Sequence, residues 1–335
     1  MIPTFLASTL AADPLPKSPP SDDFWMPLDA STFGAQVDPL YHFLLWLSII
    51  SAAGIYLAMI LFAIKYKAPA RDKNEVGDNS STHNTMLEIT WSVIPLFICI
   101  GIFVWGFKGF VDLRTPPKDA LELHAIGQKW KWTFSYPNGH MDSELHVPID
   151  RDVRIIIQSV DVLHSLYIPA FRTKMDAVPG RYTDLWFHAT KAGEFPVFCA
   201  EYCGTSHSDM LAKAVVHEAG GYEKWLDGIG ELLKNEAAEN PVAFGEKLYT
   251  KQGCKTCHST DGSTLVGPSW KGLWGSKRTF SDGSSATVDE NYILQSINDP
   301  SSQIVQGFTP SMPTYQGQMK DWELNAIIEY IKSLK

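Results

Sequence analysis

Apolar residues are concentrated in two uninterrupted runs near the N-terminal end of the chain. The first covers residues 41–66, the second covers residues 89–107, and their central stretches contain no Asp, Glu, Lys or Arg. Each run is close to the roughly 20 residues that a helix needs to cross a bilayer. The pattern therefore predicts a transmembrane hairpin over residues 40–111, with helices at about 41–66 and 88–110. Two buried core helices are the alternative, but core helices rarely stay uncharged over this length.

The segment between the two runs is basic, with Lys65, Lys67, Arg71 and Lys73. By the positive-inside rule this segment faces the cytoplasm, so both ends of the chain face outward. We expect a two-pass protein of the bacterial cytoplasmic (inner) membrane, with its remaining domains on the outer, periplasmic side. Residues 1–39 predict an extended proline-rich arm or the remnant of a signal peptide, although the basic region of such a peptide is lacking.

Beyond the second run the apolar pattern changes to alternation. Residues 129–136, KWKWTFSY, place Trp130 and its alternate neighbours on one face of a strand. Further short strand candidates and the turn signal YPNGH predict an all-β sandwich over residues 112–219. Residues 220–240 predict a charged helical linker, and residues 241–335 predict a third domain.

Composition narrows the possible functions. The 335 residues carry a formal net charge of −9, which argues against a nucleic-acid partner. The five cysteines are too few for a disulfide scaffold, and four of them form two close pairs, CxxxC and CxxC. Both pairs stand beside histidines, which makes metal or cofactor chemistry the leading interpretation.

The CxxxC pair stands in the loop CAEYCGTSHSDM, where Cys199, Cys203, His207 and Met210 are potential ligands. His164 lies upstream, just after a predicted strand. Zinc sites do not use methionine, whereas copper electron-transfer sites combine thiolate, imidazole and a weak thioether ligand. A single blue copper ion needs one cysteine, so two thiolates indicate a pair of bridged copper ions. A disulfide between the two cysteines is the alternative.

The CxxC pair is followed by a histidine in the sequence GCKTCHST. CxxCH is the attachment signature of c-type haem, with thioethers on Cys254 and Cys257 and with His258 placed to bind the iron. A redox-active CxxC without haem is the alternative from the motif alone. Copper and haem would both lie on the outer side of the membrane, in agreement with the predicted topology.

The pattern H…CxExCxxxHxxM behind a two-helix hairpin resembles the cytochrome c oxidase subunit 2 family over about residues 40–217. The resemblance implies a cupredoxin-like fold and a binuclear copper A centre. It carries the family's copper ligands over to six positions, with Glu201 acting through its main-chain carbonyl: His164, Cys199, Glu201, Cys203, His207 and Met210. Asp209 departs from the family, whose members usually carry an apolar or aromatic residue before the methionine.

The same resemblance implies roles for four further side chains. The Glu201 carboxylate matches a magnesium ligand at the contact with subunit 1, and Asp161 matches an acid near that site. Trp130 matches the tryptophan that receives electrons, although a core strand residue is the alternative. Glu88 matches the glutamate at the mouth of a proton pathway into subunit 1, and it also fits a capping box that begins at Thr85.

Residues 240–335 resemble a small class I cytochrome c over their whole length. The helical segment PVAFGEKLYTKQ precedes the haem motif, and KDWELNAIIEYIKSL closes the domain. The resemblance implies Met312 as the sixth iron ligand, with Met319 as the weaker candidate. Ligation by histidine and methionine raises the reduction potential to a range useful to a terminal acceptor.

These features imply a multidomain membrane protein with a two-helix hairpin, a cupredoxin-like β-sandwich and an all-α cytochrome c domain. The implied function is to pass electrons from a donor through c-type haem to two copper ions and on to a haem–copper subunit. That subunit would reduce oxygen to water with proton translocation, since this chain holds no oxygen-reducing site. The expected cofactors are two copper ions, one covalent haem c and a magnesium ion shared with subunit 1.

Expected partners are the lipid bilayer, subunits 1 and 3 of the oxidase, and cytochrome c or a quinol:cytochrome c reductase as donor. One alternative is the copper A subunit of a nitric oxide reductase, which only the catalytic partner would distinguish. Another is a membrane-anchored copper-delivery protein, which would gain nothing from haem. A quinol oxidase subunit would lack the copper ligands that are present here.

Overall fold

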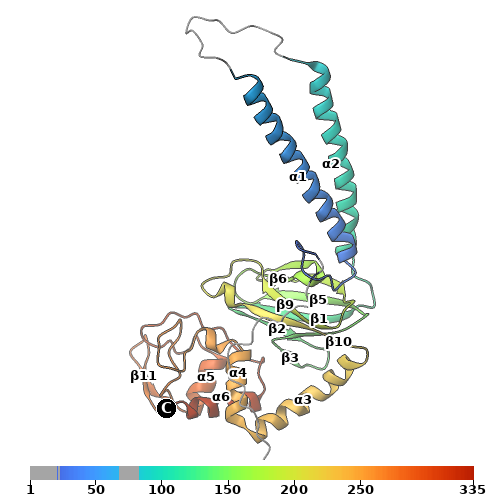
Figure 1. Cartoon of the computed structure of the whole chain (residues 1–335). Coiled ribbons are helices and arrows are strands. Elements are labelled where there is room, and N and C mark those ends of the chain that lie inside the picture. Colours follow the sequence, from blue (N-terminus) through green and yellow to red (C-terminus); the bar gives the residue numbers. More distant parts are fainter. Residues whose placement is uncertain (1–20, 22, 68–82) are drawn as a thin grey trace, which may run out of the picture. The chain divides into compact units, whose positions relative to one another are not determined.

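The computed structural model describes residue 21, residues 23–67 and residues 83–335, and it divides into two compact units. One unit is residues 32–115, and the other holds the remaining described residues (Figure 1). Most of the predicted N-terminal arm, together with Arg71 and Lys73 of the basic segment, lies outside the described residues.

The first unit is a pair of long helices, α1 (Gly34–Lys65) and α2 (Thr85–Leu113). Both are long and apolar enough to cross a membrane, and their most apolar stretches bury no residue inside the protein. Side chains such as Ile50 and Phe97 are each 67% exposed. Core helices would hide these side chains, so the transmembrane prediction is confirmed and the alternative of buried core helices is wrong.

The first helix begins earlier than predicted, at Gly34 rather than at residue 41. The apolar run marks only the part of a helix that lipid must cover. Backbone hydrogen bonding continues past that run through the polar residues Gln36 and Asp38. Pro39 lies inside the helix, in its second turn, where it removes one backbone hydrogen-bond donor.

The N-terminus of α2 is capped one residue earlier than the sequence suggests. Asn84, not Thr85, is the cap residue: its side chain accepts a hydrogen bond from the Leu87 amide at 3.1 Å. The Glu88 carboxylate reaches back and accepts a hydrogen bond from the Asn84 amide at 3.3 Å. Glu88 is therefore held at the helix start, where it is half-buried.

The second unit begins with a β-sandwich of two five-stranded sheets, as predicted. The first sheet has the order β3-β2-β1-β5-β8 and contains Met141–Asp142, Lys131–Ser135, Leu121–Gln128, Asp152–Ser159 and Thr183–His188. The second has the order β4-β10-β9-β6-β7 and contains Leu145–Pro148, Leu211–His217, Gly193–Cys199, His164–Ile168 and Thr173–Ala177.

The core of the sandwich follows from strand alternation. In β5, every second residue is buried, and Ile155 and Ile157 are fully inaccessible. Leu166 and Ile168 of β6 are equally buried in the opposite sheet. Burying side chains of this size contributes roughly 1.5–3 kcal/mol each, which holds the loops at the sheet ends on a rigid base.

The predicted linker is a helix, α3 (Gly221–Glu239), and it packs on the sandwich. The indole of Trp225 stacks on the His146 imidazole, with ring centroids 4.0 Å apart and planes 11° from parallel. His146 Nδ1 lies 2.9 Å from His217 Nε2 on β10. This contact anchors the helix to strands β4 and β10.

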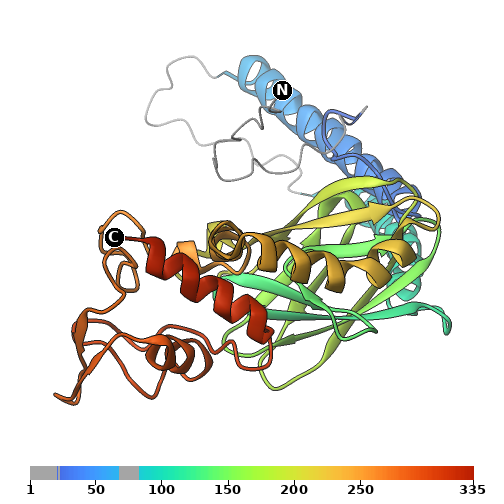
Figure 2. The same cartoon turned by 90° about the horizontal axis from the view of Figure 1, so that it is seen from below.

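The third domain contains α4 (Pro241–Lys251), the 3-10 turn η3 (Cys254–Thr256), α5 (Glu290–Asn298) and α6 (Asp321–Ser333). A small hairpin, β11 (Lys277–Thr279) with β12 (Ser285–Thr287), is added to the predicted helices. The dark red helix α6 ends near the C-terminus (Figure 2). It crosses α4 so closely that a Cβ on Gly245 would lie 2.1 Å from the Ala326 carbonyl oxygen, so only glycine fits there.

Candidate metal centre and haem pocket

The copper-ligand candidates meet at one end of the second sheet. Cys199 is the last residue of β9, and Met210 immediately precedes β10. Strand β6 pairs antiparallel with β9, with Leu166 opposite Cys199, so His164 at the start of β6 reaches the same loop. The two sheet strands thus bring together residues that lie far apart in the sequence.

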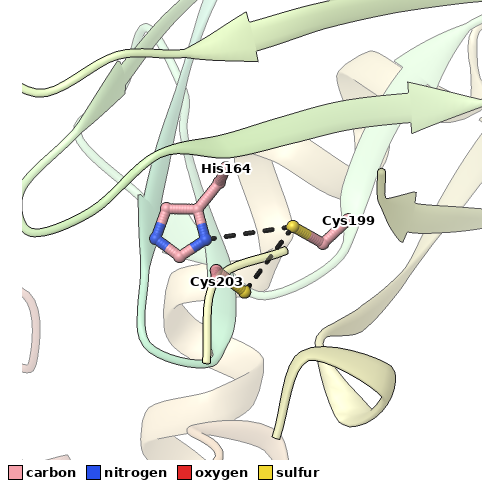
Figure 3. Close-up of side chains that lie close together, drawn as sticks. All are labelled: His164, Cys199 and Cys203. Carbon is pink, nitrogen blue, oxygen red and sulfur yellow. Dashed lines mark hydrogen bonds between the residues drawn. The ribbon is translucent and has the colours of Figure 1, made fainter. Parts of the chain in front are cut away.

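The donor atoms of His164, Cys199 and Cys203 form a compact cluster (Figure 3). The Sγ atoms of Cys199 and Cys203 lie 3.8 Å apart, and Cys199 Sγ lies 3.9 Å from His164 Nδ1. Cys203 Sγ lies 3.4 Å from His207 Nδ1 and 3.8 Å from Met210 Sδ. His164 thus faces the Cys199 thiol, whereas His207 and Met210 face the Cys203 thiol.

The donor set fits a pair of copper ions. Both cysteines are free thiols, which disagrees with the disulfide alternative. With metal–sulfur bonds of about 2.3 Å, two sulfurs on one ion can lie up to roughly 4.6 Å apart, so the observed 3.8 Å allows shared metals. The Met210 thioether, which is fully buried, favours copper over zinc.

The main-chain carbonyl oxygen of Glu201 also faces the cluster, 3.3 Å from Cys199 Sγ. It therefore stands where the family resemblance requires a carbonyl ligand. Asp209, the departure from the family, is exposed, whereas the neighbouring Met210 side chain is inaccessible. The polar residue at position 209 therefore does not expose the Met210 thioether to solvent.

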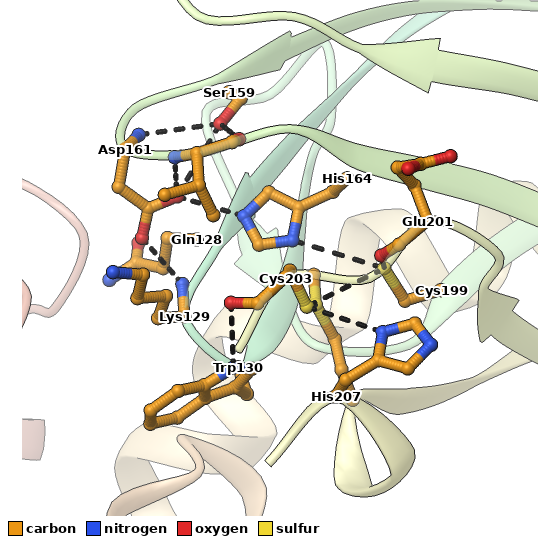
Figure 4. Close-up of polar contacts among 12 residues, drawn as sticks. Gln128, Lys129, Trp130, Ser159, Asp161, His164, Cys199, Glu201, Cys203 and His207 are labelled. Atoms are coloured by element: carbon orange, nitrogen blue, oxygen red, sulfur yellow. Dashed lines mark hydrogen bonds and ion pairs between the residues drawn. The ribbon is translucent and has the colours of Figure 1, made fainter. Parts of the chain in front are cut away.

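Asp161 contacts the candidate copper ligand His164 (Figure 4). Its Oδ1 lies 2.8 Å from His164 Nε2, and its Oδ2 accepts a hydrogen bond from the Lys129 amide at 2.7 Å. Burial raises the pKa of Asp161, but the hydrogen bonds from His164 and Lys129 outweigh it and lower that pKa. The carboxylate therefore fixes the histidine ring.

The two thiols have opposite tendencies to ionise. Burial disfavours the Cys199 thiolate, but hydrogen bonds with His164 and with neighbouring groups of the loop together outweigh burial and lower the pKa of Cys199. Burial and the neighbouring Cys199 charge raise the pKa of Cys203. Two adjacent thiolates repel each other, and a bound cation between them would remove that repulsion.

Trp130 connects this cluster with the third domain. Its indole Nε1 donates a hydrogen bond to the Cys203 carbonyl at 3.1 Å, and the side chain is 9% exposed (Figure 4). Trp130 also lines a cavity whose other walls include Cys254, Cys257 and Met312. The sequence predicts each of these residues, but not that one tryptophan touches both groups.

The cavity has the features that a c-type haem requires. His258 Nδ1 lies 2.7 Å from the Pro268 carbonyl oxygen, which fixes the ring through Nδ1 and leaves Nε2 available. Gly267 packs on the same ring, and a Cβ there would lie 2.7 Å from His258 Cε1. Met312 and Met319 both line the cavity, and Met319 is the more buried of the two.

Three family descriptions match the chain in this order. "Cytochrome C oxidase subunit II, transmembrane domain" matches residues 20–108, and "Cytochrome C oxidase subunit II, periplasmic domain" matches residues 139–218. "Cytochrome c" matches residues 242–335. Cytochrome c oxidase subunit 2 of Alkalihalophilus pseudofirmus is 31% identical over 315 residues, which cover 90% of this chain and 89% of that protein.

The chain belongs to the cytochrome c oxidase subunit 2 family. The alternative cytochrome c oxidase subunit 2 of Bradyrhizobium diazoefficiens is 29% identical, over 61% of this chain and 83% of that protein. A crystal structure of the periplasmic domain of subunit II of cytochrome oxidase of Bradyrhizobium japonicum is 32% identical. It covers 35% of this chain and 98% of that chain, with a TM-score of 0.33.

As a subunit 2 with a C-terminal cytochrome c domain, the protein is part of an oxidoreductase complex. Its role in that complex is the entry of electrons into the oxidase. Its family implies a haem–copper oxidase with a subunit 1. It is a two-pass membrane protein with an outer domain. These predictions are confirmed, and the family also supports copper A and haem as cofactors.

The sequence did not predict two buried polar side chains near these sites, those of Lys131 and Gln252. Lys131 belongs to the polar positions of the KWKW pattern, which predict an exposed side chain, yet it is 5% exposed. Gln252 precedes the haem motif and is 9% exposed. Neither residue carries a motif, and their burial follows from contacts between domains that lie far apart in the sequence.

Proposed function

We propose that electrons pass from a donor to haem at His258, then to copper A, and then to a haem–copper subunit that reduces oxygen to water with proton translocation. When bound, the haem and the copper pair would each accept and release one electron. The residues of the chain hold these groups and bring their edges close together.

The observation that carries this proposal is the position of Trp130. One side of its indole is hydrogen-bonded to the carbonyl of the ligand candidate Cys203. Another part of the side chain lines the cavity that contains Cys254, Cys257 and Met312. A single residue therefore borders both cofactor sites, with a hydrogen bond on the copper side and a place in the cavity wall on the haem side, which supports direct transfer between them.

The copper ligands in this proposal are His164, Cys199, Cys203, His207 and Met210, together with the main-chain carbonyl of Glu201. The contacts among their donor atoms, from 3.3 to 3.9 Å, support the set. The two thiolates, the Nδ1 atoms of both histidines and the Met210 thioether would hold the ions, and this soft donor set would suit copper in electron transfer.

We further assign the haem thioethers to Cys254 and Cys257 and the iron ligands to His258 and Met312. The helix and loop order of residues 242–335, which match a cytochrome c, supports this assignment. A covalent haem would be of no use to a copper-delivery protein, so it distinguishes the two functions.

Glu88 is proposed as the mouth of a proton pathway, since its half-buried carboxylate lies at the start of a membrane-spanning helix. The Glu201 side chain is proposed as a magnesium ligand shared with subunit 1. For Asp161, the hydrogen bonds to His164 and Lys129 favour a role in holding the copper ligand over a role in binding magnesium. The proposal also includes subunit 3 as a partner, cytochrome c or a quinol:cytochrome c reductase as the electron donor, and the bacterial inner membrane as the location.

The proposal is tested by replacing Trp130 with phenylalanine in the purified oxidase complex. We expect haem and copper contents to stay unchanged while electron transfer from haem to copper slows at least tenfold, because the hydrogen bond to Cys203 is lost. Trp225→Phe, which changes an aromatic side chain on the linker helix, is the matched control and should transfer electrons normally. Equal rates in both variants would contradict the proposed route.

A second measurement concerns the reaction itself. The complex should consume oxygen with an added reduced cytochrome c as donor, and chelators should not strip its copper. A complex that reduces nitric oxide but not oxygen, or a chain that gives up copper to a weak chelator, would contradict the proposed function.

A further inference from the structure

The haem pocket is not built from the cytochrome domain alone. Lys129, Trp130 and Lys131, at the turn into β2 of the copper-binding sandwich, line the same cavity as Cys254 and Cys257. Lys131 is 5% exposed, which is unusual for a lysine. A cationic side chain of one domain thus enters the wall of a pocket in the other.

The Lys131 amine is held by two groups of the cytochrome domain. Its Nζ donates a hydrogen bond to Gln252 Oε1 at 3.0 Å and lies 4.2 Å from the centroid of the Tyr315 ring. The Tyr315 hydroxyl in turn donates a hydrogen bond to the Gln252 carbonyl at 3.0 Å. Gln252 stands two residues before Cys254 in the chain. The contact with Gln252 therefore holds the Lys131 ammonium beside the predicted haem attachment.

Other contacts hold the two domains together independently of Lys131. Lys251 Nζ lies 2.7 Å from Asp142 Oδ1, and the Asp142 side chain is 2% exposed. Gln318 Nε2 donates a hydrogen bond to Gln128 Oε1 at 3.1 Å. The placement of Lys131 is therefore a consequence of a whole interface, and it does not depend on one flexible side chain.

Burial without an acidic partner within hydrogen-bond distance disfavours the charged amine. It lowers the pKa of Lys131 to about 8, although the groups at Cys254 and Glu323 oppose the change. The position of the amine over the Tyr315 ring favours its protonated form, in which it also donates a hydrogen bond to Gln252 Oε1. A buried positive charge is poorly screened by solvent, so it acts strongly on charge changes nearby.

We propose that Lys131 of the copper-binding domain is a functional part of the haem site, where its buried ammonium raises the reduction potential of the haem in the docked protein. Reduction adds one negative charge to the haem, and the fixed positive charge stabilises that added charge. The inference rests on the proposed function, because it requires a haem attached at Cys254 and Cys257. It makes the copper-binding domain a regulator of the haem potential as well as its electron acceptor.

The test is a potentiometric titration of the haem absorbance in the intact complex at pH 7. Lys131→Met keeps the length of the side chain and removes the charge. We expect the haem-to-copper electron equilibrium to shift about tenfold, which corresponds to a fall of about 59 mV in the haem potential. Lys255→Met is the matched control, since it removes an exposed lysine between the two haem cysteines, and it should shift the potential far less.

A third variant separates charge from docking. Lys251→Met breaks the contact with Asp142 and leaves Lys131 in place. If it lowers the potential as much as Lys131→Met, or if Lys131→Met leaves the potential unchanged while haem stays attached, the inference is overturned. A protein that carries no covalent haem by mass would instead contradict the proposed function.

Discussion

Oδ1 of Asp161 lies 2.8 Å from Nε2 of His164, while Nδ1 of the same imidazole lies 3.9 Å from Cys199 Sγ. The carboxylate and the thiol therefore contact opposite nitrogens of one buried ring. Because Asp161 accepts the proton on Nε2, the lone pair of Nδ1 is left for a metal. The hydrogen bond orients the ligand before any ion binds.

Asp161→Asn should weaken copper binding by about 10- to 100-fold, the usual effect of losing a carboxylate that orients a histidine ligand. Competition with a chelator of known affinity measures the change. Asp209→Asn is the control, since it removes an exposed carboxylate next to Met210 without touching a ligand ring. Equal copper affinities in the two variants would show that Asp161 does not hold His164.

The two cysteines should be indispensable for a copper pair. Cys199→Ser or Cys203→Ser should each abolish the mixed-valence paramagnetic signal, because a serine hydroxyl cannot supply a bridging thiolate at neutral pH. Met210→Leu should retain copper and change its reduction potential, since the thioether is a weak ligand. An unchanged paramagnetic spectrum in both serine variants would disprove the bridged pair.

The two candidate iron ligands can be separated by spectroscopy. Met312→Ala should remove the absorption that a sulfur–iron bond gives oxidised c-type haem, while the thioethers at Cys254 and Cys257 keep the haem attached. Met319 belongs to the buried core of the cytochrome domain, so Met319→Ala should lower stability by about 2–5 kcal/mol. Loss of the sulfur–iron absorption in Met319→Ala alone would reverse the assignment.

Transfer from haem to copper inside the chain should be nearly independent of salt. Residues 112–240 carry six more acidic than basic side chains, whereas residues 241–335 are neutral, so long-range attraction between the domains is small. The tether gives an effective concentration on the order of millimolar, and the Lys251–Asp142 pair is shielded by burial of the carboxylate.

Flash-induced electron transfer between roughly 10 and 500 mM salt tests this, because Debye lengths fall from about 30 Å to under 5 Å. Asp142→Asn should slow the transfer at every salt concentration, whereas Glu194→Gln, which changes an exposed carboxylate, should not. A tenfold slowing of the unmodified protein at high salt would mean that docking is electrostatic.

Acid should loosen the linker helix α3. Burial and the nearby His146 lower the pKa of His217, although Glu223 opposes the change. The unfolded protein therefore binds a proton that the folded protein disfavours, so the stability that neutral His217 provides is lost as the pH falls from about 6.5 toward the lowered value. Glu144 and Arg151 are the other charged groups near this cluster.

Hydrogen exchange of the α3 amides, corrected for intrinsic rates, should show faster opening at pH 5 than at pH 7.5. His217→Asn should reduce that difference, because it removes the group that titrates. His188→Asn, on the other side of the sandwich and paired with Asp152, serves as the control. Identical pH profiles in all three proteins would refute a role for His217.

The sequence alone predicted the elements and groups whose chemistry depends on neighbours along the chain. An uncharged run of membrane length can be stable only against lipid, which is why the hairpin was predictable. The spacings CxxxC and CxxCH place their side chains together whatever the rest of the fold does. Met210 and His207 followed from the same loop, so most of the copper set needed no structure.

Only the tertiary structure decided which distant residues join these groups. His164 reaches the loop because β6 pairs with β9 at Leu166 and Cys199, and that register is set by the packing of two sheets. The burial of Lys131 depends on contacts with Gln252 and Tyr315, 121 and 184 positions away. The place of Trp130 in the wall of the haem cavity likewise depends on residues that lie far along the chain. Local pattern carries no information about such contacts, because the free energy that selects them comes from burying whole surfaces against each other.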